Sequence, residues 1–232
     1  MQATSPVMQV KQAKKLPSIE KDRFGGTCPN KGCVPSKLLI GHAEVARSIQ
    51  EASRHFIDAT IKHIDVARIF EETNAHIEKV DPAYRAKFNE NVTTYTGVAS
   101  FVSNYVVEVN GKQLTAPKIV IATGTRPVAP PYEKAWTSDD IFPLSEKVLK
   151  SITIVGAGFI ACELANFFDA VGVETKLLAR SQSILKNEDE EISAIFKEQF
   201  TKHVDVDFDT SIKHSEYKEN MFHLTQSLLT QK

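Results

Sequence analysis

Cysteine is scarce in this chain, with three residues in 232. So few thiols argue against a disulfide-stapled extracellular domain, and we recognise no secretory signal. No apolar run approaches the roughly 20 residues of a membrane span. The formal net charge is only −1, which offers a nucleic acid little attraction. We therefore expect a cytoplasmic protein that binds neither nucleic acid nor membrane, and 42% hydrophobic residues suffice for one or two cores.

Two of the three cysteines, Cys28 and Cys33, lie in the run GGTCPNKGCVPSK, residues 25–37. If Cys33 begins a helix, the loop before it can bring the two sulfurs within bonding reach, which requires Cα atoms roughly 4.4–6.8 Å apart. A helix N-terminus also stabilises a thiolate, and Pro35 suits a first helical turn. The run predicts a redox-active dithiol at the start of a helix.

Two other uses of these thiols stay open. Half of a zinc site is one, although zinc needs about four N or S ligands and the third cysteine, Cys162, lies in a different motif. A structural disulfide is the other, although it would suit an oxidising compartment. The complete run of glycines, thiols, proline and lysine favours the catalytic pair.

The apolar periodicity predicts an α/β chain. We expect a short strand ending at Glu20, helices over 34–56, 64–80 and 82–89, and strands over 92–96, 98–103 and 105–109 with a hairpin turn at Asn110-Gly111. Residues 118–122 have the apolar pattern of a buried strand, whereas the tail, 221–232, loses the strand pattern.

A second motif follows a predicted strand over 152–155. Gly156, Gly158 and Ala161 form a G-x-G-x-x-A pattern that opens a predicted helix to about Val171, and residues 173–179 form the next strand. This βαβ context predicts a dinucleotide site, with the pyrophosphate at the helix N-terminus. A tight strand–helix turn without a ligand is the simpler alternative.

The end of that second strand bears on the choice of nicotinamide cofactor. NAD sites usually place an acid there for the ribose 2′-hydroxyl, but the position is Ala179, followed by Arg180 and Lys186. Basic groups would hold a 2′-phosphate instead, so we expect NADP(H) to be favoured over NAD(H). Alternatively, Arg180 simply solvates the strand end.

The cysteine run closely resembles the active-site segment of the class I pyridine nucleotide-disulfide oxidoreductases, flavoproteins that include dihydrolipoamide dehydrogenase, glutathione reductase and mercuric reductase. The resemblance covers about residues 17–208. It implies that Cys33 is the charge-transfer thiol beside FAD and that Cys28 attacks the substrate disulfide. It also implies that Lys37 lies near the flavin and pairs with Glu163, although both residues could be ordinary surface charges. The FAD-lining positions implied are Glu20, for the ribose, with Gly26, Thr27, Lys37, Gly97, Ala99, Thr123 and Gly124.

The resemblance implies two Rossmann-like dinucleotide-binding domains, an FAD domain with a small β-meander over 1–150 and an NAD(P) domain over 151–232. Both are expected to be incomplete. Glycine is absent before Glu20, where the family has its first phosphate loop, and no histidine lies in the family's His-x-x-Pro context. The dimer domain and acid/base histidine would lie beyond Lys232.

Three hypotheses follow from the family pattern. The chain descends from a homodimeric NAD(P)H- and FAD-dependent reductase of a small or lipoyl-type disulfide, whose activity needs the missing parts. Alternatively, it is a non-catalytic dinucleotide-binding or redox-sensing remnant. A third possibility is that the chain does not fold alone, because losing a central parallel strand leaves neighbouring hydrogen bonds unmade.

Overall fold

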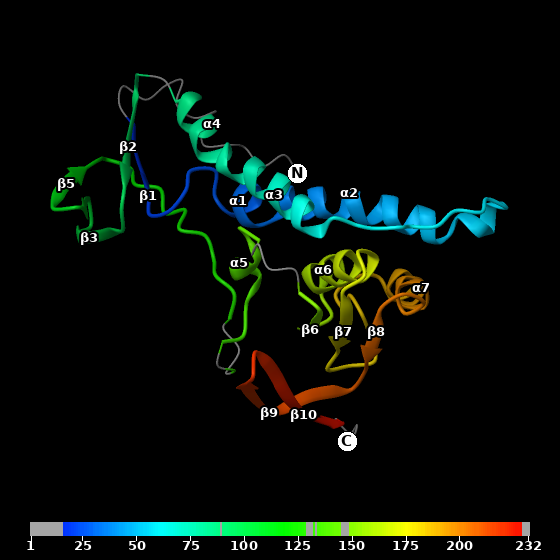
Figure 1. Ribbon diagram of the computed structural model, residues 1–232. Helices are drawn as coiled ribbons and strands as arrows, with labels where there is room; N and C mark the ends of the chain where they lie inside the picture. The colour runs from blue at the N-terminus through cyan, green and yellow to red at the C-terminus, as the bar shows by residue number, and fades with distance from the viewer. Residues whose placement is uncertain (1–15, 89, 129–131, 133, 145–148, 229–232) are drawn as a thin grey trace.

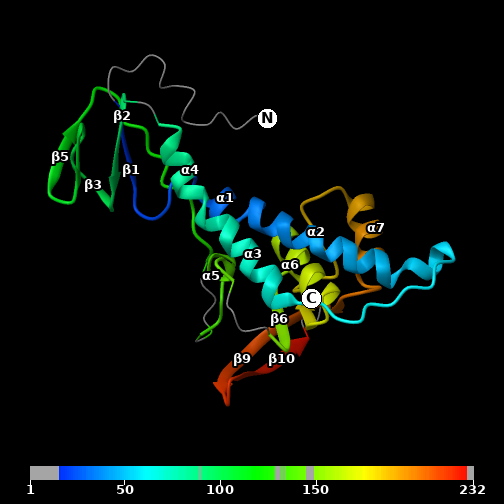
Figure 2. The same cartoon turned by 45° about the horizontal axis from the view of Figure 1, so that its top comes forward.

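The computed structural model describes residues 16–88, 90–128, 132, 134–144 and 149–228. The first part contains β1 (Leu16–Glu20), α1 (Thr27–Lys31), α2 (Cys33–Gln50), the 3₁₀ turn η2 (Ala52–His55), α3 (Val66–Glu78), α4 (Val80–Ala86) and β2 (Val92–Thr96). Strands β1 and β2 pair in parallel, with Glu20 opposite Thr96. Helices α2 and α3 lie side by side in both ribbon views (Figure 1, Figure 2).

A small antiparallel meander follows β2. It consists of β3 (Ala99–Ser103), β4 (Val106–Val109) and β5 (Lys112–Thr115), in that order across the sheet. The predicted turn at Asn110-Gly111 joins β4 to β5, with φ of 52° and 74° at its two residues. These left-handed values are what a tight hairpin requires, and Asn-Gly adopts them readily. The predicted β-meander is therefore confirmed.

The second part contains α5 (Ser138–Ile141), β6 (Ser151–Val155), α6 (Phe159–Ala170), β7 (Glu174–Leu178), α7 (Glu190–Phe200) and β8 (Asp205–Asp207). Strands β6, β7 and β8 form a parallel sheet in that order. The run β6–α6–β7 is the predicted βαβ unit, so the α/β class is confirmed.

The main core lies where α2, α3 and α6 meet. It includes Leu39 and Ala43 from α2, Phe70 from α3, and Phe167 and Phe168 from α6. Apolar residues at three- and four-residue steps place one stripe of each helix in this core. Because the core takes residues from both sides of residue 150, it joins α6 to the dithiol helix. The division into domains at that residue stays a prediction.

Two sequence expectations are wrong. Residues 118–122 form no strand, and Val120 and Ile121 are 82% and 69% exposed. Apolar character alone does not make a strand, because the backbone also needs a hydrogen-bonding neighbour. Among the described residues β1 and β2 form a sheet of only two strands.

The tail departs from expectation in the opposite sense. Strands β9 (Thr210–Lys218) and β10 (Met221–Leu228) pair as an antiparallel hairpin, while residues 229–232 lie outside the described part. Glu219 and Asn220 make its turn, with φ of 51° and 61°. The turn lacks the glycine that usually reveals such a hairpin, and most of β10 is exposed, so no buried alternation revealed the strand.

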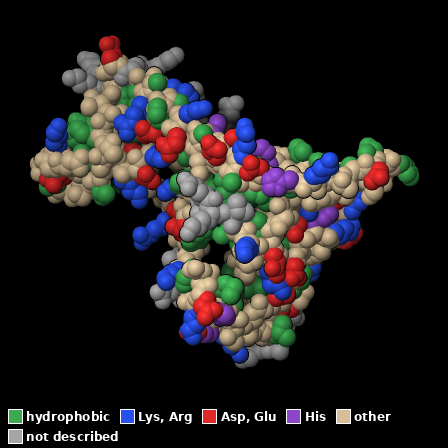
Figure 3. All heavy atoms as spheres, viewed as in Figure 1, with side chains coloured by type: hydrophobic (Ala, Val, Ile, Leu, Met, Phe, Trp, Pro, Cys, Tyr) green, Lys and Arg blue, Asp and Glu red, His purple; other side chains and the backbone are tan. Residues whose placement is uncertain are grey.

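Charged side chains of both signs are interspersed on the face drawn in Figure 3. Within the described ranges, no helix is both long and apolar enough to cross a membrane.

Candidate active site

The dithiol run folds as two consecutive helices. Cys28 lies in the short helix α1, and Cys33 is the first residue of α2, after Gly32. The prediction that Cys33 begins a helix is confirmed, and Pro35 is buried in the first turn of α2. Both thiols are exposed and neither is in a disulfide. The described dithiol is therefore the reduced form, open to a small reactant.

The loop before α1 is held by residues that the sequence did not single out. Asn30 is buried, and its amide donates to the carbonyl oxygens of Phe24 and Gly26 at 3.2 and 2.9 Å. The N–H of Phe24 donates to Asp81 at 2.7 Å. Asp81 follows Cys28 by more than fifty residues, so no local pattern could have linked it to the dithiol. These contacts fix the backbone that presents Cys28.

A hydrogen bond with Cys33 is the main cause that raises the pKa of the Cys28 thiol above its ordinary value. Partial burial and the charge of Cys33 act in the same direction, while backbone N–H groups of Cys33 and Val34 oppose them. The N–H groups at the start of α2 thus favour the thiolate, as a helix N-terminus should, but the contributions that raise the pKa of Cys28 outweigh them. In this reduced state, Cys28 holds its proton.

This shift predicts how Cys28 reacts with pH. Because only the thiolate is alkylated, the rate of modification by iodoacetamide should still be climbing at about pH 9, where an ordinary thiol has begun to level off. Replacing Cys33 with serine weakens the thiol contact and should move the plateau to lower pH. Mass spectrometry of the Cys28 peptide measures both profiles, and a plateau below about pH 8 in the unmodified chain would contradict the expectation.

Polar contacts join the dithiol helix to the helix of the glycine motif. The Lys37 ammonium pairs with Glu163, and the Ser36 hydroxyl donates to the same carboxylate at 3.1 Å. Towards the far ends of the two helices, Arg47 pairs with Asp169. Helices α2 and α6 therefore run in the same direction, with their N-termini at one end. The structure brings Lys37 and Glu163 together, as the resemblance implied, from positions 126 apart in sequence.

The glycine motif forms a tight turn between β6 and α6. Gly156 has φ 127°, a value that favours glycine, and its N–H donates to Leu178 O at 3.0 Å. Gly158 is the residue that caps the start of α6, and Ala161 follows in its first turn. A Cβ on either glycine would meet open space. A free N-terminal turn approached by bare backbone fits a pyrophosphate.

Arg180 is the second residue after β7, and Lys186 lies six residues further on. Both side chains are exposed. Ala179 is fully buried. Its N–H donates to Asp207 O at 2.8 Å and its carbonyl accepts from Thr210 N at 2.9 Å, so its backbone is held between β8 and the start of β9. The first exposed side chain after β7 is thus the cation of Arg180 and not an acid.

The predicted FAD positions divide into two groups. Glu20 and Gly97 meet where β1 and β2 end, since Gly97 N donates to Glu20 O at 2.9 Å. Gly26 has φ 69°, and a Cβ added to it would meet open space, as a close ligand contact would require. A Cβ on Gly97, in contrast, would lie 2.5 Å from Oδ1 of the Asn110 side chain, so a larger residue here would have to displace that amide.

The remaining FAD positions are all exposed. Thr27 begins α1, Ala99 begins β3, and Thr123 and Gly124 lie in the irregular segment after β5. No hydrogen bond within the described ranges joins Thr123 or Gly124 to Glu20 or Gly26. Their assignment to the flavin nucleotide stays a prediction.

Cys162 behaves differently from the other two cysteines. It is buried in α6 against the second core cluster. Burial, with a smaller contribution from the charge of Glu163, raises the pKa of this thiol to about 12. Such a thiol is a packing residue and not a nucleophile. Within the described part of the chain, no group of three or more His, Cys, Asp or Glu side chains could hold a metal ion.

A shallow apolar hollow of about 390 Å³ lies at the other end of α2. Ile49, Ile61, Ile64 and Val171 contribute to its lining. Because α2 and α6 run in the same direction, this hollow is at the end remote from the cysteines and the glycine motif. It plays no part in the dithiol chemistry.

Comparison with known proteins gives a consistent result. Residues 8–232 match the family described as pyridine nucleotide-disulphide oxidoreductase. The chain is 36% identical over 201 residues to mycothione reductase of Mycobacterium tuberculosis, covering 79% of this chain and 43% of that protein. It is 34% identical over 182 residues to glutathione reductase of Burkholderia cepacia, covering 77% and 40%.

A third relative is mercuric reductase of Lysinibacillus sphaericus, 32% identical over 197 residues, with 82% of this chain and 36% of that protein covered. The chain thus spans less than half the length of these relatives. Among solved structures, the Cu(II) complex of the HOCl-induced flavoprotein disulfide reductase RclA from Escherichia coli superimposes with a TM-score of 0.79, at 22% identity, over 94% of this chain and 49% of that one.

Proposed function

From the fact that this chain belongs to the pyridine nucleotide-disulphide oxidoreductase family, we infer its role. We propose that it is the dithiol-bearing part of a reductase that uses NADPH and FAD to reduce a small disulfide. The contact of Lys37 and Ser36 with Glu163 carries the proposal. Through this contact the start of α2, which carries the dithiol, lies beside the start of α6, which follows the glycine motif. Electron transfer from a nucleotide at α6 to the dithiol would require these two helix starts to be close.

The thiol chemistry can be written on the chain's own residues. Once Cys28 has given up its proton, its thiolate attacks one sulfur of the substrate disulfide, which forms a mixed disulfide and releases the first thiolate. The Cys33 thiolate then attacks the Cys28 sulfur, closing the Cys28–Cys33 disulfide and releasing the second thiolate. Bound NADPH and FAD would supply the two electrons that reopen this disulfide.

Family membership implies FAD and a pyridine nucleotide, and we assign the residues as follows. Glu20 would bind the FAD ribose, with Gly26, Thr27, Lys37, Gly97, Ala99, Thr123 and Gly124 lining the flavin nucleotide. Gly156, Gly158 and Ala161 would hold the NADPH pyrophosphate, and Arg180 and Lys186 its 2′-phosphate. Open space at Gly26, Gly156 and Gly158 supports the fit.

The substrate and setting of the whole protein belong to the same proposal. The relatives are named for mycothione, glutathione and mercuric reduction, so we expect a small or lipoyl-type disulfide, handled by a homodimer. The cytoplasm suits a dithiol that must return to its reduced form.

Purified chain tests the proposal directly. A yellow protein whose flavin absorption is bleached by NADPH supports it. A colourless protein that still binds NADPH, and whose thiols merely cycle, would favour the redox-sensing alternative instead.

Replacing Arg180 with alanine tests the cofactor assignment. Loss of a charge-assisted hydrogen bond to the 2′-phosphate should lower the preference for NADPH over NADH by about one to two orders of magnitude. The measurement is a fluorescence titration with each reduced nucleotide, and Lys202→Ala serves as a control cation on the surface. An unchanged preference would rule out Arg180 as a 2′-phosphate ligand.

A further inference from the structure

The segment between β7 and α7 carries both proposed 2′-phosphate ligands, Arg180 and Lys186. Their side chains are exposed, so what orients them is the backbone of the segment. That backbone is held by contacts with the glycine motif, which the sequence singled out, and with α7, which it did not.

Leu185 is the central contact. It has φ 56°, a left-handed value that is uncommon for a bulky side chain. Its N–H donates to Ala157 O at 2.8 Å, inside the glycine motif. Its carbonyl accepts from the Ser193 hydroxyl of α7 at 2.9 Å, and Ser193 is only 9% exposed. One residue therefore links the proposed pyrophosphate loop, the segment beside Lys186, and α7.

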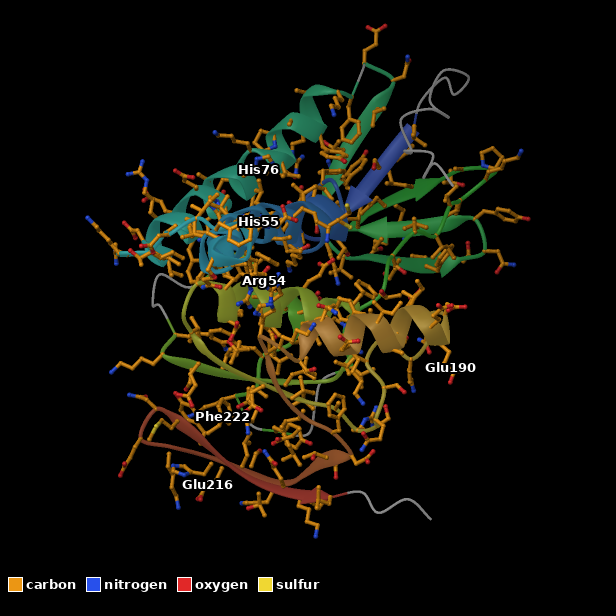
Figure 4. The ribbon with its side chains drawn as sticks, turned by 90° about the vertical axis from the view of Figure 1, so that its right-hand side faces the viewer. Arg54, His55, His76, Glu190, Glu216 and Phe222 are labelled. Atoms are coloured by element: carbon orange, nitrogen blue, oxygen red, sulfur yellow. The ribbon has the colours of Figure 1, made fainter. Side chains whose placement is uncertain are left out.

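A second contact holds the segment nearer Arg180. The Lys197 ammonium donates to the carbonyl oxygen of Gln182 and lies 4.0 Å from the centre of the Phe208 ring. The Gln182 amide in turn donates to Asp209. Figure 4 shows α7, labelled at Glu190 in its first turn, beside α6. Ser193 and Lys197 lie one turn apart along α7 and hold the segment at Leu185 and at Gln182.

We propose that Ser193 and Lys197 are positioning residues for nucleotide selection: they hold the segment after β7 against the glycine motif, at the spacing that a nucleotide with both a pyrophosphate and a 2′-phosphate requires. The proposal rests on the proposed function. Neither side chain needs to touch the nucleotide, because each acts through a backbone carbonyl.

Replacing Ser193 with alanine should raise the Kd for NADPH about five- to tenfold, the scale of one lost hydrogen bond, and change the Kd for NADH by about twofold or less. Ser193→Thr keeps the hydroxyl and should restore most of the NADPH affinity. Thr201→Ala is the matched control, because it removes the hydroxyl of the residue that follows α7, bonded to Lys197 O at 2.9 Å, without touching the segment. Lys197→Met tests the second contact from a half-buried position and should act in the same sense.

Isothermal titration of the unmodified chain and of each of the four variants with each nucleotide gives the Kd values, and circular dichroism confirms that each variant is folded. Equal losses of NADPH and NADH affinity would mark Ser193 as merely structural and overturn the inference, as would no loss in either variant. In both cases NADPH binding by the unmodified chain leaves the proposed function intact. An unmodified chain that binds neither nucleotide would instead overturn the proposed function, and the inference with it.

Discussion

Replacing Cys28 with serine should slow the reduction of a small disulfide by about a thousandfold or more, because enzymes that lose their nucleophile slow by at least this factor. The dithiol is exposed and reduced, so the test needs no flavin. The chain is reduced with dithiothreitol, desalted and mixed with glutathione disulfide. Per chain, one disulfide should be consumed and two thiols released as Cys28–Cys33 closes.

The other two cysteines provide the controls. Cys33→Ser keeps the attacking thiol but cannot resolve the mixed disulfide, so it should stop after releasing one thiol, with glutathione attached at Cys28 in the mass spectrum. Cys162→Ser should behave like the unmodified chain, because the Cys162 thiol is buried and its pKa is raised to about 12. Full activity in Cys28→Ser, or glutathione attached at Cys33 instead, would contradict the proposed division of roles.

The sequence was most informative where chemistry is encoded locally. The dithiol run and the glycine motif each lie within a short stretch, because a helix start and a strand–helix turn need particular residues at fixed spacing. Cys33 at the start of α2 and Gly158 at the start of α6 confirm those two local predictions.

The sequence was least informative where a partner lies far along the chain. Asn30 and Asp81 hold the loop of Cys28, but nothing near either residue announces the contact. Residues 118–122 have strand composition without a strand, since the missing requirement is a neighbour and not a propensity. The hydrogen bond from Ser193 to Leu185 O likewise depends on a left-handed backbone conformation at Leu185, which the composition of the segment does not suggest.

Replacing Phe167 with alanine should lower the free energy of unfolding by about 3–5 kcal/mol. Phe167 has no exposed surface, and its ring centre lies 5.2 Å from that of Phe168 and 6.2 Å from that of Phe70 on α3. The substitution removes a large apolar side chain and leaves a cavity that the packed helices can fill only partly. Because domains are stable by only about 5–15 kcal/mol in total, this one change approaches the limit of folding.

Phe159, at the other end of the same helix, is the matched control. It is 65% exposed, so Phe159→Ala should cost about 0.5 kcal/mol or less. Urea denaturation followed by circular dichroism compares the two, and equal losses of unfolding free energy would show that α6 does not pack as described.

The packing of Phe167 also bears on function. Phe167 lies one turn from Glu163 on α6, so the core that it fills is what keeps this carboxylate within reach of Lys37. We therefore expect Phe167→Ala to weaken NADPH binding as well as to lower the free energy of unfolding. Phe159→Ala should leave the free energy of unfolding nearly unchanged.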